Sequence, residues 1–237
     1  MRTLAIGDIH GCLTALRLVL EAVQPGKDDV LVTLGDYVDR GPDTKGVLDT
    51  LLELEKTTQL KPLMGNHEVL FLEAAADMLD QAAWMRIGGR ETLLSYAPDQ
   101  ETPSWDNVTE AHLDFIANRC LRYWENATHL FVHANANAVL PLSEQSDMWL
   151  FWTRFEESFP HVSGKTLICG HTAQKAGIPT VRPQAICLDT WVYGHGWLTC
   201  MDVEAGLFVQ ANQAGQVKRL TFADLELLSM SLPTQPL

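Results

Sequence analysis

Three short motifs in the first 70 residues place carboxylate, imidazole and amide side chains beside glycines. Residues 7–11 are Gly-Asp-Ile-His-Gly, residues 35–41 are Gly-Asp-Tyr-Val-Asp-Arg-Gly, and residues 65–68 are Gly-Asn-His-Glu. Each motif follows a short apolar run that predicts a buried strand, and two later apolar runs lead to His133 and His171. Because ligands bind beyond the carboxyl ends of strands in open α/β sheets, we expect these groups to meet at one site.

The donor types of this expected site indicate divalent metal ions. Imidazole, carboxylate and amide ligands without a thiolate suit Mn, Fe or Zn rather than a cysteine-based structural zinc site. Six donors exceed the needs of one catalytic ion, whereas two ions about 3.5–4 Å apart, bridged by a carboxylate, would use them all. An isolated Gly-Asp is ordinarily a cap or turn, and an isolated histidine a buried hydrogen-bonded side chain, but the joint pattern favours a dinuclear centre. The candidate ligands are Asp8, His10, Asp36, Asn66, His133 and His171.

Apolar periodicity predicts the elements that must position these side chains. Three strands, each followed by a helix, are expected at residues 4–6, 30–32 and 60–64, with the helices at 13–23, 47–54 and about 68–83. This succession predicts parallel pairing through right-handed crossovers. Two further strands are expected at 130–132 and 166–168. Brief apolar segments separated by glycine turns favour antiparallel strands at 185–188, 198–202 and 207–209.

The length and the middle of the chain indicate a single domain, residues 1–237, with a helical cap-like segment at about 84–124. With 237 residues, 46% of them apolar and 20% charged, the chain suits one α/β domain with an appendage better than two domains. Within the cap-like segment, proline and aspartate predict a loop at 97–106. The prolines after Leu232 predict a frayed tail.

Charge and cysteine content exclude some partners. The 17 basic and 30 acidic residues leave a net charge of −13, which repels nucleic acids and anionic membranes, so neither is an expected partner. A phosphorylated substrate would need metal ions or local arginines to reverse that potential inside the site. Five scattered cysteines without a CxxC pair favour a reducing compartment, and the start of the chain lacks a signal-peptide h-region. We therefore expect a cytoplasmic protein.

The ordered motifs from Gly7 to His171 resemble those of the calcineurin-like metallophosphoesterases. Residues 35–41 look like the phosphoprotein phosphatase (PPP) branch, particularly its bacterial and phage serine/threonine protein phosphatases, and diadenosine tetraphosphatases are almost as similar. Residues 188–190 (Leu-Asp-Thr) and 196–199 (Gly-Trp-Leu-Thr) are similar to the last strands of both branches. The resemblance implies an α/β fold, a two-sheet mixed β-sandwich flanked by helices in four α/β/β/α layers.

The resemblance also implies a role for each motif residue. It places Asp8, His10 and His171 on one metal, Asn66 and His133 on the other, and Asp36 as the bridge. His67 is the expected general acid, with Asp39 fixing its tautomer. Arg40 is expected to bind phosphoryl oxygens through two hydrogen bonds, and Arg154 is nominated as a second substrate-binding arginine. Arg90, His195 and Trp191 receive no role from the sequence, although a bulky Trp191 departs from the small residue that relatives usually carry.

These roles predict hydrolysis of phosphomonoesters, most of all phosphoserine and phosphothreonine in proteins. A water shared by two divalent cations, with Mn the first choice in vitro, loses a proton near neutral pH, and this metal-bridging hydroxide would attack phosphorus in line. The alternative is a bis(5'-nucleosyl)-tetraphosphatase, which needs a pocket for a base and a polyphosphate. A binding module without activity is a third possibility, which the complete ligand set argues against. The substrate is expected to be a phosphoprotein or a small phosphoester, and no regulatory subunit is inferred.

Overall fold

The computed structural model describes residues 1–99 and 102–231, and the strands in these ranges form two mixed sheets. The larger sheet contains, in spatial order, β11 (Val217–Thr221), β10 (Leu207–Ala211), β9 (Leu198–Asp202), β1 (Thr3–Ile6), β2 (Val30–Thr33) and β3 (Gln59–Pro62). The smaller sheet contains β4 (Trp124–Glu125), β5 (His129–Phe131), β6 (Thr166–Cys169), β8 (Ala185–Cys187) and β7 (Thr180–Arg182).

The pairing of the strands follows the sequence predictions with one exception. The strands β1, β2 and β3 are parallel neighbours, and β9 and β10 are antiparallel, as expected. The segment at 185–188 is the exception, because β8 pairs in parallel with β6 and is antiparallel only to β7. Glycine turns around a strand do not encode its direction, which here is set by the path that returns the chain after β6. The strands β4, β7 and β11 were not predicted.

Two of the three expected early helices have the expected bounds or nearly so. The helix α1 spans Leu13–Val23, and α2 spans Thr44–Leu54, where the Asp43 side chain caps it by accepting a hydrogen bond from the Gly46 amide at 2.7 Å. The third helix, expected to reach about residue 83, is shorter: α3 spans Asn66–Ala75. Asp77 takes a left-handed φ of 56°, which ends the helix. A new short helix, α4 (Gln81–Trp84), follows.

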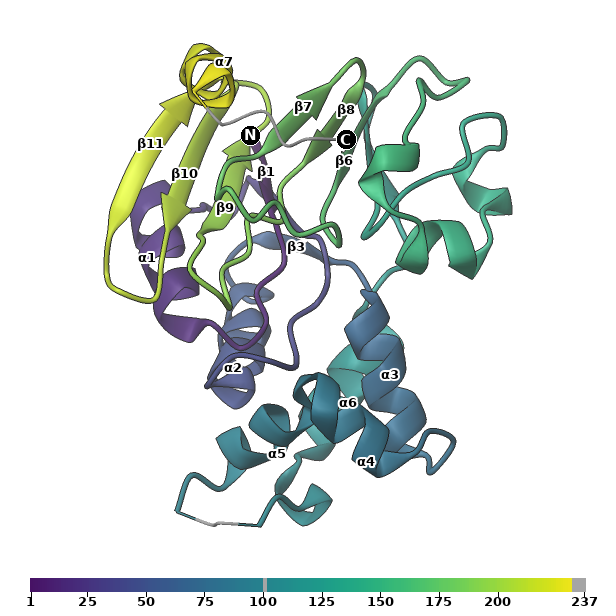
Figure 1. The fold of residues 1–237 in the computed structure, drawn as a ribbon, viewed down its shortest axis with the longest axis vertical. Helices are drawn as coiled ribbons and strands as arrows, with labels where there is room; N and C mark the ends of the chain where they lie inside the picture. Colours follow the sequence, from purple (N-terminus) through teal and green to yellow (C-terminus); the bar gives the residue numbers. More distant parts are fainter. Residues whose placement is uncertain (100–101, 232–237) are drawn as a thin grey trace.

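The cap-like segment is mostly helical, as the sequence predicts. After α4 it contains η1 (Met85–Gly89), α5 (Arg90–Tyr96), η2 (Trp105–Asn107), α6 (Glu110–Asp114) and η3 (Phe115–Arg119). Figure 1 shows α3 to α6 gathered below the two sheets. Of the expected loop at 97–106, residues 100 and 101 lie outside the described ranges, as does the tail from residue 232 onward. An unpredicted helix, α7 (Phe222–Met230), follows β11.

Alternating apolar side chains divide the core into three layers. Leu4 and Ile6 of β1 face α1 and α2, whereas Ala5 faces the space between the sheets. In β5, Phe131 likewise faces the other sheet, and Leu130 faces outward. That outer face is covered by short turns rather than long helices, η4 (Leu142–Glu144), η5 (Met148–Trp152) and η6 (Phe155–Glu157).

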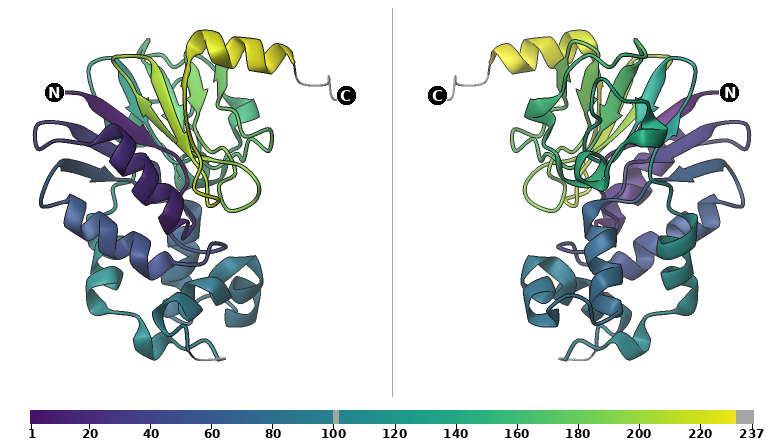
Figure 2. Two further views of the ribbon diagram at one scale, coloured as in Figure 1. Left: turned by 90° about the vertical axis from the view of Figure 1, so that its left-hand side faces the viewer. Right: turned by 90° about the vertical axis from the view of Figure 1, so that its right-hand side faces the viewer.

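The two-sheet sandwich flanked by helices is therefore confirmed, and Figure 2 shows it from the sides. The helix α1 covers one face of the larger sheet next to β9 and β10. All five cysteines are free, and four of them are buried. Within the described ranges, no helix is long and apolar enough to cross a membrane.

Candidate metal centre and active site

The loops after the strands of both sheets bring the six candidate ligands together. Asp8 and Asp36 follow β1 and β2, and Asn66 begins α3 after β3. His133 and His171 follow β5 and β6 of the smaller sheet, so the site lies where the carboxyl ends of both sheets converge. The contacts below join these six residues across sequence separations of up to 163 positions.

Asp36 lies at the centre of the cluster between two imidazoles. Its Oδ2 is 3.3 Å from Nε2 of His10, and its Oδ1 is 3.4 Å from Nε2 of His133. The Asp36 side chain is only 3% exposed, and the His67 amide donates to its Oδ1 at 3.1 Å. One carboxylate oxygen toward each histidine is the arrangement that a bridging ligand requires.

The backbone holds two of the histidines in the tautomer whose Nε2 can accept a hydrogen bond or bind a metal. Nδ1 of His10 lies 2.9 Å from the Val38 carbonyl, and Nδ1 of His133 lies 2.8 Å from the Leu34 carbonyl. Because each Nδ1 donates to a carbonyl, the lone pair sits on Nε2 in the neutral ring. Burial lowers the pKa of both histidines, which favours the neutral form that a metal ligand must have.

His171 lies with Asn66 and His133 rather than with His10. Its Nδ1 is 3.0 Å from Oδ1 of Asn66, and Nε2 of His133 is 2.9 Å from the same oxygen. The His171 ring is 5.1 Å from the His133 ring, and only its backbone amide contacts Asp8, at 3.0 Å. Burial, followed by the charge of His133, lowers the pKa of His171 to about 4. The side-chain contacts thus differ from the expected grouping of His171 with Asp8 and His10.

The charge of the site fits cations. Among the described residues, neither Asp8 nor Asp36 forms an ion pair with a lysine or arginine, although both are 2% exposed. Burial, followed by the charges of Asp189 and Asp36, raises the pKa of Asp8. Buried carboxylates are stable as anions only when they are paired or bind a metal. Two overlapping donor groups lie within 4.8 Å, one of His10, Asp36 and His67 and one of Asp8, Asp36 and His133.

By distance, His67 belongs to the first of these groups, but its hydrogen bonds suit it to a different role. Its Nδ1 is 2.6 Å from Oδ2 of Asp39, a carboxylate that also accepts from Trp84 Nε1 at 3.2 Å and from Thr92 Oγ1 at 3.0 Å. Burial lowers the pKa of His67, but the charge of Asp36 and the Asp39 hydrogen bond outweigh it, so the net shift of this pKa is upward. A histidine that keeps its proton beside an electrophile is suited to general acid catalysis.

Arg40 reaches the cluster from the loop after Asp36. Its Nη1 donates to Nε2 of His10 at 2.7 Å, and its guanidinium lies 4.6 Å from the ring centre of Tyr193. The residue has a left-handed φ of 73°, and its amide donates to the Gly88 carbonyl at 3.3 Å. Gly88 has φ 128° and carries no Cβ, which lets the helical segment touch the Arg40 backbone.

Outside this cluster of contacts lie Arg154, Arg90 and His195. The Arg154 side chain is 68% exposed and pairs with Glu156 at 3.2 Å, and Arg90 is exposed at the start of α5. His195 is exposed, with its ring 5.9 Å from that of Trp191. Arg154 stays a candidate on the resemblance alone.

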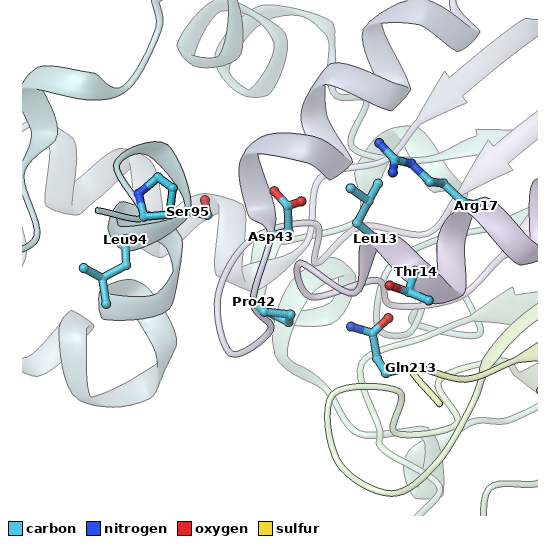
Figure 3. Close-up of a pocket in the computed structure, with 9 residues that line it drawn as sticks. Leu13, Thr14, Arg17, Pro42, Asp43, Leu94, Ser95 and Gln213 are labelled. Atoms are coloured by element: carbon cyan, nitrogen blue, oxygen red, sulfur yellow. The ribbon is translucent and has the colours of Figure 1, made fainter. Parts of the chain in front are cut away.

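Neither of two cavities among the described residues is lined by a candidate ligand. One of about 620 Å³ separates the start of α1 from α5, with Leu94 and Ser95 on one side and Leu13 and Arg17 on the other in Figure 3. The second, of about 830 Å³, is lined by Arg154, Lys175 and part of α7 among others.

Sequence reasoning missed a residue that shapes the site. The carboxylate of Glu68, which is fully buried, accepts hydrogen bonds from the amides of Asp36 and Tyr37 at 2.7 Å, and from those of Gly65 at 2.9 Å and Val38 at 3.2 Å. It therefore ties the loop that carries Asp36 to the loop that carries Asn66. Glu68 stands beside candidate ligands in the sequence, but three of its four partners, Asp36, Tyr37 and Val38, are 30 to 32 positions away.

Comparison with known proteins identifies the family. The family model of the calcineurin-like phosphoesterases matches residues 1–196, so the chain belongs to that family. Serine/threonine-protein phosphatase 1 of Salmonella typhimurium is 39% identical over 85 residues, which cover 35% of this chain and 37% of that protein. The symmetrical bis(5'-nucleosyl)-tetraphosphatase of Pseudomonas fluorescens is 26% identical over an alignment of 270 positions, gaps included, which covers 87% of this chain and 89% of that enzyme.

The fold is shared with solved structures. The crystal structure of a protein assigned as a diadenosine tetraphosphatase superposes with a TM-score of 0.63 at 22% identity, over 92% of each chain. The chain spans 26–42% of the lengths of the first curated relatives it matches. The family is one of metal-dependent hydrolases with dinuclear centres, and the clustered histidines and aspartates described above are the candidate ligands in this chain.

Proposed function

We propose that this protein is a two-metal phosphoesterase that hydrolyses dinucleoside polyphosphates symmetrically. With diadenosine tetraphosphate, water would attack a central phosphorus, the bridging P–O bond would break, and two molecules of adenosine diphosphate would result. The alignment with the tetraphosphatase of P. fluorescens over 87% of the chain carries this proposal. It reverses the order that the sequence motifs alone favoured, in which phosphoserine and phosphothreonine came first.

We assign Asp8, His10 and Asp36 to one cation, and Asp36, Asn66, His133 and His171 to the other. The regrouping of His171 rests on its 3.0 Å contact with Asn66. When bound, such cations lower the pKa of a shared water and so supply the nucleophile. Their identity among Mn, Fe and Zn stays a prediction from ligand type.

Two residues of the chain act on the substrate in this proposal. Arg40, whose guanidinium is 2.7 Å from His10, would hold phosphoryl oxygens with two parallel hydrogen bonds. His67, held by Asp39 at 2.6 Å, would give its proton from Nε2 to the oxygen of the leaving group. Arg154 is an exposed candidate for the more distant phosphates.

A phosphoprotein phosphatase is the second candidate. The 39% identity to the Salmonella phosphatase supports it, although the matched region covers only 35% of the chain. Phosphoserine and phosphothreonine esters need the same metal ligands, Arg40 and His67, so the two candidates differ only in what surrounds the phosphorus. The expected reducing, cytoplasmic location stays a prediction from the cysteine pattern.

The test is a comparison of kcat/KM for diadenosine tetraphosphate and a phosphoserine peptide with metal-stripped protein reloaded with Mn. We expect the dinucleotide to be preferred by about a hundredfold or more, which corresponds to about 2.7 kcal/mol of transition-state binding. Preference for the peptide by that factor would replace the proposal with the second candidate. An Asp36→Asn variant is the control for contaminating phosphatases, since it lacks the bridging carboxylate.

A further inference from the structure

The backbone of Trp191 adopts a conformation that is unfavourable for a residue with a large side chain. Its φ is 63°, in the left-handed region that glycine occupies freely and that bulky residues rarely adopt. The surrounding loop enforces this geometry: the Trp191 carbonyl accepts from the amides of Gly194 and Gly196 at 3.1 Å, and its amide donates to Asp189 at 3.0 Å. Strain that the surroundings over-determine is concentrated at functional sites.

The Trp191 ring continues a row of rings that begins at the metal centre. The Tyr193 ring is 4.8 Å from the ring of His10, and the Trp191 ring is 6.3 Å from that of Tyr193. Trp191 and Tyr193 are both half-buried, and exposed His195 lies edge-on to Trp191. The row therefore leads from a candidate ligand and Arg40 to the surface.

One side of the Trp191 ring packs on the Gly194 backbone, and a cation lies over the ring. A Cβ at Gly194 would collide with the indole, so any larger residue there would displace it. The Lys175 ammonium is 5.8 Å from the ring centre, so a base that stacks on that face would displace this flexible side chain. Lys175 also lines the cavity of about 830 Å³ that contains Arg154. The aromatic ring of Trp191 suits a base, and Lys175 with the adjoining cavity suits the phosphates of a nucleotide.

We propose that Trp191 stacks against the base of a nucleotide substrate, with Lys175 contacting the phosphates between the base and the metal centre. This inference rests on the proposed function and adds the residue that distinguishes a nucleotide from other phosphoesters. Stacking of a base on an aromatic side chain is tolerant of base identity, so adenine and guanine nucleotides should both bind.

The test measures binding rather than turnover. Calorimetry on the metal-loaded protein gives Kd for adenosine diphosphate and for pyrophosphate, which has the phosphates but no nucleoside. We expect wild type to bind adenosine diphosphate about fivefold or more tighter than pyrophosphate, since stacking has that order of effect. Trp191→Gly should lose this preference and keep its affinity for pyrophosphate, while Trp191→Phe should keep most of the preference.

Glycine suits φ 63°, which offsets part of the packing lost with the half-buried indole, so Trp191→Gly should stay folded, and a denaturation curve checks this. Trp124→Phe, on edge strand β4, is the control that should leave both affinities unchanged. Equal weakening of both ligands in Trp191→Gly, or no change in either, would overturn the inference.

The two proposals fail in different ways. If the protein does not cleave diadenosine tetraphosphate but Trp191→Gly loses the preference for adenosine diphosphate, the stacking role of Trp191 is kept and the proposed substrate class is rejected. If it cleaves the dinucleotide and Trp191→Gly binds both ligands as wild type does, the substrate class stands and the stacking residue falls.

Discussion

At the scale of single residues, the candidate site consists of proposed ligands whose protonation is set by their neighbours. Backbone carbonyls orient His10 and His133, whereas a carboxylate orients His67. The imidazoles of His10 and His133 are thereby suited to bind metal and that of His67 to carry a proton, although all three are buried.

The role of His67 predicts a dependence on the leaving group. His67→Asn should slow hydrolysis of an alkyl phosphate by about 10²–10⁴-fold, because an alkoxide must be protonated as it leaves. An aryl phosphate, whose leaving group is a weaker base, should lose about tenfold or less. Steady-state kinetics with the two esters measures the contrast. Equal losses on both substrates would remove His67 from the role of general acid.

The buried carboxylate of Glu68 predicts a loss of stability. Glu68→Gln replaces one of two acceptor oxygens by an NH2 group that must face backbone N–H donors, so the free energy of unfolding should fall by about 2–3 kcal/mol. Urea denaturation measures this change. Glu53→Gln is the matched control, since the Glu53 side chain is 73% exposed and its removal should have an effect of less than about 0.5 kcal/mol. Equal stability of the two variants would contradict the role of Glu68.

At the scale of elements, loops after parallel strands hold the site, and the helical segment closes against one of them. The contact between η1 and the Arg40 loop depends on Gly88, whose missing side chain leaves the Arg40 backbone room. The same approach brings Trp84 and Thr92 of this segment to Asp39. The segment thus positions Arg40 and, through Asp39, the proposed general acid His67.

Gly88→Ala tests this contact. Its φ of 128° and the nearby Arg40 amide mean that an added Cβ must displace the Arg40 loop, so we expect kcat/KM to fall by about tenfold or more. Gly164→Ala is the control, because Gly164 has φ 73° but nothing within 4 Å of the added Cβ. Gly164→Ala should lose about 1 kcal/mol of stability, as Gly88→Ala should, but it should keep full activity. Full activity in both variants would refute the positioning role of this contact.

The ion pair that ties the start of β1 to the turn before β2 predicts a pH dependence. The Asp29 side chain is 11% exposed, and its hydrogen bond with the Arg2 guanidinium at 2.7 Å holds the pKa of Asp29 well below its ordinary value. Stability from a carboxylate with a lowered pKa is present above the unfolded pKa of about 4, and it is lost as the pH falls toward the folded value.

Asp29→Asn should therefore lower the free energy of unfolding by about 1 kcal/mol near pH 7, and the difference from wild type should shrink below about pH 4. Urea denaturation at several pH values measures it. A difference that stays constant down to pH 3 would show that the ion pair is not its source.

At the scale of the whole molecule, the two sheets contribute to one candidate metal site, so we expect metal binding and folding to be linked. Asp8 and Asp36 come from the larger sheet, and His133 and His171 from the smaller one. A cation held by these residues would join the two halves of the sandwich and would offset the repulsion between buried carboxylates.

Removal of metal should therefore lower the melting temperature. Adding Mn at about 100 times its Kd to chelator-treated protein should stabilise it by about 2.7 kcal/mol, or raise Tm by roughly 5–10 °C. Differential scanning calorimetry measures this shift. Asp36→Asn should show little of it, and a full shift in that variant would place the cations elsewhere.

Much of this architecture was predictable because its signals are local. Parallel strands at 3–6 and 30–33 and the helices after them follow from apolar periodicity within about ten residues. The direction of β8, the break after α3 and the edge strands β4 and β7 were not predictable. Strand direction depends on the path of the intervening loop, and short edge strands carry too few apolar residues to be seen.

The sequence by itself determined which residues could bind metal, because donor types and their place at strand ends are properties of the chain. Only the tertiary structure decided which of these residues lie together. His171 lies beside Asn66 because the smaller sheet brings its strand end there, and Glu68 and Trp191 acquire their roles from partners and a backbone conformation set by distant segments. Ligand chemistry is encoded residue by residue, whereas proximity between two sheets is a property of the packed molecule.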